Sequence, residues 1–187
     1  GRRVLVRATD VSDPDQIAAL FRHLDAEFGQ IDFLGNVAGD AVLGAPEELP
    51  LTEVKRVFQT LVFGRFCMCQ EAGKRMLAAG RGSIINIASM SAILPLSRVV
   101  AYSASKAAIV NLTRALALHY ANQGVRVNCV CPGVTDTPFL ANVRSAPDAD
   151  ALLARYAQMM PIGRLAQPEE IAEAILFLAS DAASFCV

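Results

Sequence analysis

A tyrosine and a lysine four residues apart are the side chains of this sequence best suited to proton transfer. Tyr102 and Lys106 begin a segment whose pattern predicts a helix over residues 102–122, and side chains four apart on a helix share a face. A phenol alone is a poor acid or base near neutral pH, because its pKa is about 10. A nearby ammonium favours the phenolate, so we expect Lys106 to lower the pKa of Tyr102 into a useful range.

Ser89 is the third candidate, because it ends a predicted strand over residues 83–88 and can hold a substrate oxygen beside the phenol. The plainer interpretation is an interfacial tyrosine and a solvated lysine. The chain has only three tyrosines and three lysines, so a chance Tyr-x-x-x-Lys would occur about 0.05 times per chain. The spacing therefore favours an acid/base pair.

Strand-like and helix-like segments alternate along the chain, which predicts an α/β fold with a doubly wound, Rossmann-like parallel sheet. The expected strands cover residues 4–6, 33–37, 83–88 and 125–130. The expected helices run between residues 12 and 29, from a Thr52 cap to 79, over 102–122, and over 168–179. We expect a single domain over 1–187, in which the looser segment 134–167 forms a substrate lid.

Ligands of such sheets bind at the carboxyl ends of the strands. Here those ends are Asp10, Ala38-Gly39, Ala88-Ser89 and Pro132-Gly133. The topology alone therefore brings Ser89 to the edge where a ligand is expected.

Composition describes an ordinary globular protein, with 53% hydrophobic and 19% charged residues and a formal net charge of -1. No overall field would steer it to nucleic acid or to an anionic membrane. Apolar stretches fall short of the roughly 20 residues that a bilayer span needs, and the first seven residues are too short and too charged for a signal peptide. We expect a cytoplasmic location, five reduced cysteines packed as small hydrophobic side chains, and no metal site.

The chain resembles the short-chain dehydrogenase/reductase family over nearly its whole length. The resemblance rests on segments that occur in the family's order: Asp10-Val11, Asn36-Val37-Ala38-Gly39, 82–89 ending in Ser89, 102–108 with Tyr102 and Lys106, and 124–133 ending in Pro132-Gly133. In the second segment Val37 replaces an asparagine of the family pattern.

The resemblance implies hydride exchange between NAD or NADP and a small-molecule carbonyl or secondary alcohol. Tyr102 would be the general acid/base, Lys106 would tune Tyr102 and bind the nicotinamide ribose, and Ser89 would position the substrate oxygen. The implied cofactor contacts are Asp10, Val11, Asn36, Ala38, Gly39, Tyr102, Lys106, Pro132, Gly133, Val134 and Thr137. For Thr137 a simple cap or turn hydroxyl is the alternative.

Two features depart from the family pattern. The glycine-rich turn that meets the cofactor pyrophosphate does not occur in this sequence, and residues 4–6 align with the family's third strand. We therefore expect an incomplete sheet, without the first two strands and the last one, and weak dinucleotide binding by these 187 residues alone. The second departure is Leu61, which occupies the position of an asparagine that helps hold a water in the family's proton relay.

Other functions stay open. A catalytically silent truncated homologue would act only as a binding or oligomerisation partner, and a sugar-nucleotide epimerase or dehydratase would use the same Tyr-Lys pair. Several apolar residues fit a substrate pocket or the core equally well: Ile93, Leu94, Val99, Phe139, Leu140, Met159 and Met160. The helices over 52–79 and 102–122 are apolar on more than one face, which predicts a homodimer or homotetramer.

Overall fold

Three parallel strands form the central sheet of the computed structural model, which describes residues 3–187. They are β1 (Phe33–Asn36), β2 (Gly82–Ile87) and β3 (Val125–Val130), in the spatial order β1-β2-β3. Leu34 pairs with Ile84, and Ile84 with Val127 on the other side. The middle strand is therefore buried from both edges, as its apolar run Ile84-Ile85 requires.

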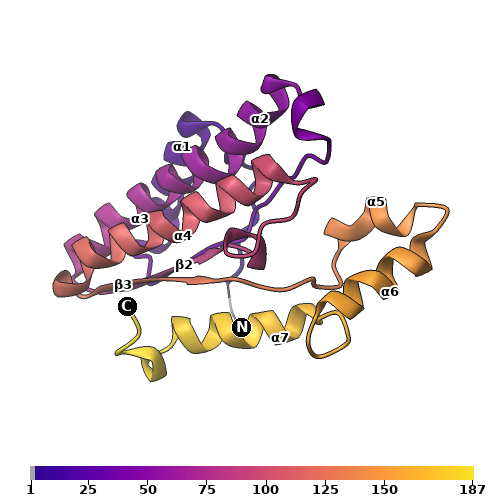
Figure 1. Ribbon diagram of the computed structural model, residues 1–187. Coiled ribbons are helices and arrows are strands. Elements are labelled where there is room, and N and C mark those ends of the chain that lie inside the picture. Colours follow the sequence, from indigo (N-terminus) through magenta and orange to yellow (C-terminus); the bar gives the residue numbers. More distant parts are fainter. Residues whose placement is uncertain (1–2) are drawn as a thin grey trace.

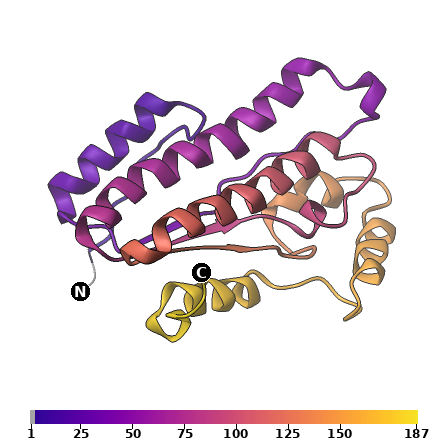
Figure 2. The same ribbon diagram turned by 60° about the vertical axis from the view of Figure 1, so that its left-hand side comes forward.

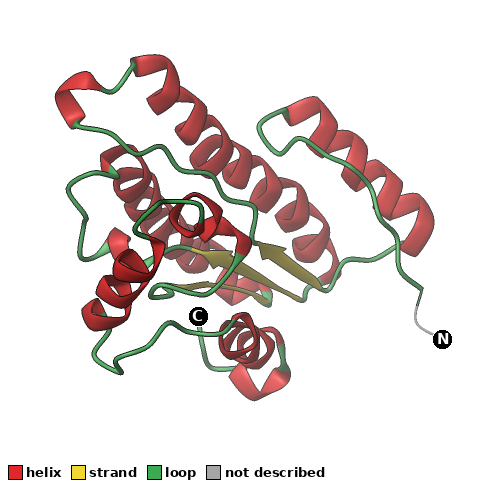
Figure 3. Ribbon diagram, turned by 90° about the vertical axis from the view of Figure 1, so that its right-hand side faces the viewer, coloured by secondary structure: helices red, strands yellow, loops and turns green. Residues whose placement is uncertain are grey.

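Helices cover both faces of this sheet (Figure 1; Figure 3). On one face lie α1 (Pro14–Phe28), α3 (Arg65–Ala79) and α4 (Val100–Tyr120), and α7 (Pro168–Ala179) lies on the other. This two-sided arrangement confirms the predicted α/β, Rossmann-like architecture with a parallel sheet.

Local sequence explains where several helices begin and end. The Asp13 carboxylate accepts hydrogen bonds from the backbone N–H groups of Asp15 and Gln16, and Pro14 occupies the first helical position of α1. Gly29 ends α1 with φ 70° and Gly124 follows α4 and its last turn with φ 83°, a left-handed conformation that favours glycine. These ends lie where the sequence predicts them.

The core has two parts. One packs α1 and α3 on the sheet and contains Ile17, Phe21, Cys69, Ala72, Met76, Ile84, Tyr120, Val125 and Val127. The other lies between α2 (Leu51–Phe58) and α4 and contains Val57, Leu61, Ala88, Ala101 and Ile109. Leu61 is fully buried there, so it contributes apolar packing where a polar side chain would need a partner.

The long helix predicted over 52–79 is interrupted. A π-helical turn, η2 (Gln59–Gly64), separates α2 from α3, and the N-cap is Pro50 instead of the expected Thr52, which lies inside the first turn. The Val11 carbonyl lies so close to Gly64 that a Cβ at residue 64 would clash with it. The Gln59 side-chain amide donates a hydrogen bond to the Ser12 carbonyl at 2.9 Å. The π turn thus holds the loop that contains Asp10 and Val11.

The strand predicted over residues 4–6 is wrong. This segment is irregular, and Val4 and Val6 are 80% and 92% exposed. An extended segment becomes a strand only when a neighbour takes up its N–H and C=O groups, and the described chain places no strand beside it.

The segment 134–167 is more ordered than its sequence predicts. It contains η5 (Pro138–Leu140), α5 (Ala141–Arg144) and an 11-residue helix, α6 (Ala149–Met159). A bridge between Thr135 and Ala166 closes the base of this excursion, which stands beyond one end of the sheet (Figure 2). Its role as a lid stays a prediction. No helix within residues 3–187 is long and apolar enough to cross a membrane.

Candidate active site

Tyr102 and Lys106 lie near the N-terminal end of α4, beside the carboxyl end of β2. The Lys106 ammonium is buried and donates a hydrogen bond to the Ile87 carbonyl oxygen at 2.7 Å. It also lies 5.4 Å from the centroid of the Tyr102 ring. The helical spacing therefore brings the two side chains together, as predicted.

Ser89 follows β2 and caps the short 3-10 turn η3 (Met90–Ala92). Its hydroxyl oxygen accepts from the Ser91 backbone N–H and from the Ser91 hydroxyl, at 3.2 and 2.9 Å. The turn that Ser89 caps packs against α4, and Ser89 is one of the groups that lower the pKa of Tyr102. The structure thus places Ser89, Tyr102 and Lys106 in one group at the strand ends.

The electrostatics of the pair differ from the expectation. Burial is the largest influence on Tyr102 and raises its pKa above the ordinary value, while Ser89 and Arg65 lower it by less. Lys106 is not among the groups that lower the pKa of Tyr102. Burial and the nearby Arg65 lower the pKa of Lys106 itself to about 7, so Lys106 carries a full charge only below neutral pH.

A second buried cation, Arg65, was not predicted from the sequence. Its guanidinium donates to the Ile87 carbonyl at 2.6 Å and to the Ala38 carbonyl at 2.7 Å. Arg65 is 3% exposed, and burial lowers its pKa to about 10. Through these two hydrogen bonds Arg65 links the end of β2, which precedes Ser89, to the loop after β1, which contains Gly39.

The segment 134–167 approaches the same place. The Phe139 and Tyr102 rings lie 6.1 Å apart between centroids, and Leu140 is buried. A Cβ at Gly133 would lie 2.7 Å from the Met160 sulfur, so the glycine admits that side chain after β3. Phe139 therefore forms part of the wall beside the phenol, whereas Ile93 and Leu94 are mostly exposed.

The predicted contacts at the N-terminal side are held in a loop. The Asp10 carboxylate accepts from the Ser12 N–H and hydroxyl at 2.8 and 2.7 Å, and these bonds lower the pKa of this exposed carboxyl. Val11 lines a small hollow with Asn36, Ala38 and Arg65 (together with Thr60 and Met68). The structure thus joins Val11 to the end of β1.

Asn36 and Gly39 differ in how they are placed. The Asn36 amide is buried and donates to the Asn86 side-chain oxygen at 2.9 Å, so it stabilises the sheet from within. Gly39 is exposed, and a Cβ there would meet only the Val37 carbonyl at 3.7 Å. The fold itself tolerates a side chain at residue 39, and the predicted reason for a glycine, close approach of a cofactor, stays a prediction.

The remaining predicted contacts follow β3. The Pro132 carbonyl accepts from the Met90 N–H at 2.8 Å, which ties this turn to the one after Ser89. The Val134 carbonyl accepts from the Ala166 N–H at 3.0 Å. Thr137 occupies the N-cap position of η5, but its side chain makes no cap hydrogen bond, so the hydroxyl is not consumed by the turn.

These residues fit the nicotinamide half of a dinucleotide. Polar groups surround the carboxyl ends of the strands. They are the exposed backbone at Ala38-Gly39, the Tyr102 hydroxyl and the Thr137 hydroxyl. An exposed carboxylate such as Asp10 suits an adenosine group better than a phosphate, because it repels anions. The described residues supply no glycine-rich helix start for a pyrophosphate.

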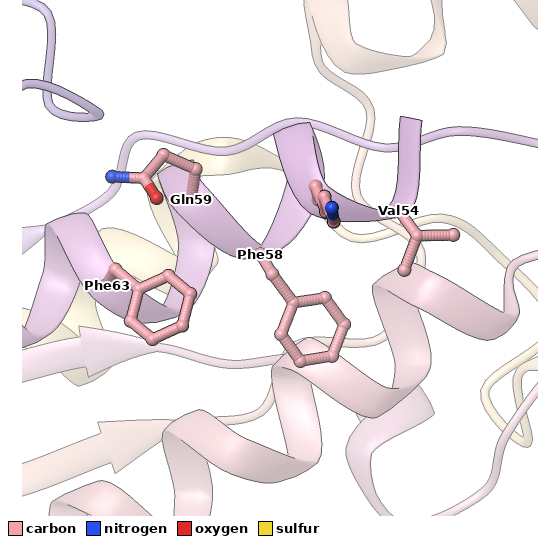
Figure 4. A pocket seen from close by; sticks show the side chains of 5 residues that line it. Val54, Phe58, Gln59 and Phe63 are labelled. Carbon is pink, nitrogen blue, oxygen red and sulfur yellow. The ribbon is translucent and has the colours of Figure 1, made fainter. Parts of the chain in front are cut away.

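Other site types find little support. A hollow of about 440 Å³ lies on α2 and η2; its lining does not include Tyr102 and consists of Val54, Lys55, Phe58, Gln59 and Phe63. Figure 4 shows its aromatic side chains. Within residues 3–187, no group of three or more His, Cys, Asp and Glu side chains could hold a metal ion. All five cysteines are free thiols.

Known proteins resemble the chain along its length. A family model described as enoyl-(acyl carrier protein) reductase matches residues 1–187. Cis-4-hydroxycyclohexanecarboxylate dehydrogenase of Sinomonas cyclohexanicum is 46% identical over 188 residues, which cover 100% of this chain and 74% of that protein. D-threitol dehydrogenase of Mycolicibacterium smegmatis is 44% identical over 177 residues, 95% of this chain and 66% of the relative. The chain thus spans about two thirds to three quarters of these relatives.

Solved structures show the same likeness. A short-chain type dehydrogenase/reductase from Mycobacterium marinum superposes with a TM-score of 0.89 at 34% identity, covering 98% of this chain and 71% of that one. A putative NAD(P) dependent gluconate 5-dehydrogenase from Beutenbergia cavernae, with bound NADP, has a TM-score of 0.88 at 36% identity, covering 95% and 70%. Both relatives and both structures carry the names of dehydrogenases or reductases.

Proposed function

The chain belongs to the short-chain dehydrogenase/reductase family, and we propose that its protein interconverts a small-molecule carbonyl and a secondary alcohol with NAD or NADP. The observation that carries the proposal is the convergence of Ser89, Tyr102 and Lys106 beside the carboxyl end of β2. A site of this kind is where ligands of open parallel sheets bind. The alternative of a silent binding partner has no comparable support, since the named relatives above are dehydrogenases.

The proton chemistry belongs to Tyr102. When bound, the nicotinamide cofactor supplies or accepts the hydride. In oxidation the Tyr102 phenolate takes the proton from the substrate alcohol and becomes the phenol, and in reduction the phenol gives that proton to the carbonyl oxygen. Ser89 holds that oxygen beside the phenol and Lys106 holds the nicotinamide ribose, while the buried Arg65 keeps positive potential near the developing alkoxide.

The cofactor would lie along the strand ends. We assign the adenosine side to Asp10 and Val11, and the nicotinamide side to the backbone at Ala38 and Gly39 and to Pro132, Gly133, Val134 and Thr137. The segment 134–167 would close over the substrate, with Phe139 as its wall beside Tyr102.

Two relatives support a proposal for the substrate class. One is named for a hydroxylated cyclohexanecarboxylate and the other for a four-carbon polyol, and both carry secondary hydroxyl groups. We propose a small polar secondary alcohol, or the matching ketone, as the substrate, and a cytoplasmic homodimer or homotetramer as the working form.

The test is an activity screen of the purified natural protein. Cyclic hydroxy acids and small polyols are offered with NAD⁺ and with NADP⁺, and the corresponding ketones with the reduced cofactors, while nicotinamide absorbance is followed. We expect turnover of at least one alcohol. A protein that turns over none of them, yet binds both cofactors, would contradict the proposed substrate class.

A further inference from the structure

Two hydrogen bonds from one residue converge on the Ser89 hydroxyl oxygen. The Ser91 backbone N–H donates to it at 3.2 Å and the Ser91 hydroxyl lies 2.9 Å from it. Ser91 belongs to the 3-10 turn that Ser89 caps, and it is only 3% exposed. The contact therefore belongs to the packed interior behind the site.

Burial decides which hydroxyl donates. In a pair of hydroxyl groups either proton can lie between the oxygens. The Ser91 hydroxyl has Ser89 as its hydrogen-bond partner within the described chain. If Ser89 were the donor, the Ser91 proton would be buried without an acceptor, which is costly. Ser91 is therefore the donor.

This arrangement limits what Ser89 can do. A serine oxygen has two lone pairs and one proton. The Ser91 N–H and O–H occupy both lone pairs, so only the Ser89 proton stays available, and the turn that Ser89 caps packs against α4, the helix that carries Tyr102. A group that can only donate favours an oxygen that carries negative charge.

We propose that Ser91 is a positioning residue that fixes Ser89 as a hydrogen-bond donor toward the Tyr102 oxygen or the substrate oxygen. The second role rests on the proposed function, whereas the first is a property of the protein alone. In either case Ser89 would stabilise the charged form: the phenolate before the reaction, or the alkoxide that develops during hydride transfer.

The surroundings of Tyr102 allow this effect to be isolated. Its charged neighbours are Arg65, from the start of α3, and Lys106 on its own helix, and Phe139 of η5 adds an uncharged ring. Replacement of Ser91 by alanine alters none of these groups. A change in the ionisation of Tyr102 therefore reports on Ser89.

The decisive experiment titrates the Tyr102 phenol by ultraviolet difference absorbance, without substrate. Subtracting the titration of Tyr102→Phe removes Tyr120 and Tyr156. We expect Ser91→Ala to lower the Tyr102 ionisation constant about three- to tenfold, the equivalent of one neutral hydrogen bond. In a Ser89→Ala background, Ser91→Ala should have no further effect.

Controls separate positioning from stability. Ser103→Ala removes another buried hydroxyl beside Tyr102, one that has no hydrogen-bond partner, and it should leave the titration unchanged. Ser91→Cys keeps the size and a weak donor, and should fall between wild type and Ser91→Ala. If Ser91→Ala does not fold, the Tyr102 titration of Ser91→Cys tests the inference in its place.

Two results would overturn the inference. One is a Tyr102 ionisation constant in Ser91→Ala equal to that of wild type, and another is a Ser91→Ala effect that persists without Ser89. Failure of the proposed function looks different: Tyr102→Phe would retain turnover, or no alcohol would react, while the titration still followed the expected pattern.

Discussion

Arg65 and Lys106 donate to the same backbone oxygen, the Ile87 carbonyl, at 2.6 and 2.7 Å. Both side chains are buried, and each is satisfied by carbonyl oxygens. Two positive groups that share one acceptor repel each other, so proximity to Arg65 helps to lower the pKa of Lys106 to about 7, second to burial. The site thus has a fixed cation, Arg65, and a titratable one.

Removing the fixed cation should move the proton chemistry to higher pH. Arg65 lowers the pKa of Tyr102 and that of Lys106, so in Arg65→Met both values should rise. We expect the rise of alcohol oxidation with pH to shift upward by at least about half a pH unit, measured as kcat against pH.

The matched control is Arg81→Met, which removes an exposed arginine paired with Asp32 on the surface. Its profile should coincide with that of wild type. An unshifted profile in Arg65→Met, with the fold intact, would mean that Arg65 has only a structural role.

Burial of Lys106 should make stability depend on pH. The pKa of Lys106 falls from 10.5 in the unfolded chain to about 7 in the fold, so between these values the unfolded state binds the extra proton. Its contribution to stability is therefore unfavourable below about pH 7 and recovers as pH rises toward 10.5. At about 1.36 kcal/mol per pH unit, the upper bound is about 5 kcal/mol.

Urea unfolding of wild type and Lys106→Met at pH 7 and pH 10 measures this difference, because other titrating groups cancel between the two proteins. The free energy of unfolding of wild type, minus that of Lys106→Met, should increase from pH 7 to pH 10. A constant gap would show that Lys106 keeps an ordinary pKa in the fold.

A buried polar chain joins the sheet to α4. The Asn86 amide donates to the Thr113 hydroxyl at 3.0 Å, and its oxygen accepts from Asn36 at 2.9 Å. Asn86→Leu should therefore destabilise the protein by roughly 2–4 kcal/mol, because the buried Thr113 hydroxyl loses its donor and the buried Asn36 amide loses its oxygen acceptor. Asn122→Ala, at an exposed position, should cost under about 0.5 kcal/mol; equal losses in the two variants would argue against the network.

The hollow on α2 and η2 bears on assembly. Phe63 is 56% exposed beside it, and Leu118 on α4 is 87% exposed. We expect a second subunit to cover these helices. Phe63→Asp should then convert the oligomer to monomer in light scattering at micromolar concentration, whereas Phe28→Asp on α1 should not. A wild-type monomer would contradict the prediction.

Local patterns predicted much of the scaffold. The bounds of β3 and α7 agree with the residues predicted, because strand alternation, the proline start and Gly124 are local signals. The strand over residues 4–6 failed, since pairing depends on a neighbour that composition does not reveal. Helix α6 was also missed, although its alanine-rich, acid-started sequence is a usable helix signal.

The candidate site also contains residues that local sequence predicted and one that only the tertiary structure reveals. Tyr102, Lys106 and Ser89 were proposed from their types and spacing, and the structure brings them to the same strand ends. Arg65 was not, because an arginine in an amphipathic helix normally indicates an exposed face, and only the tertiary structure buries it. The pKa shift of Tyr102 was predicted with the wrong sign, since burial by neighbouring elements raises this pKa by more than Ser89 and Arg65 lower it.

The most direct test of the central claim is the turnover of Tyr102→Phe in the natural protein, with a substrate found in the alcohol and ketone screen. Loss of a positioned acid/base should reduce kcat at least about a hundredfold, while the dissociation constant for the nicotinamide cofactor changes little. Near-native turnover of Tyr102→Phe would contradict the assignment of Tyr102 as the proton-transferring group.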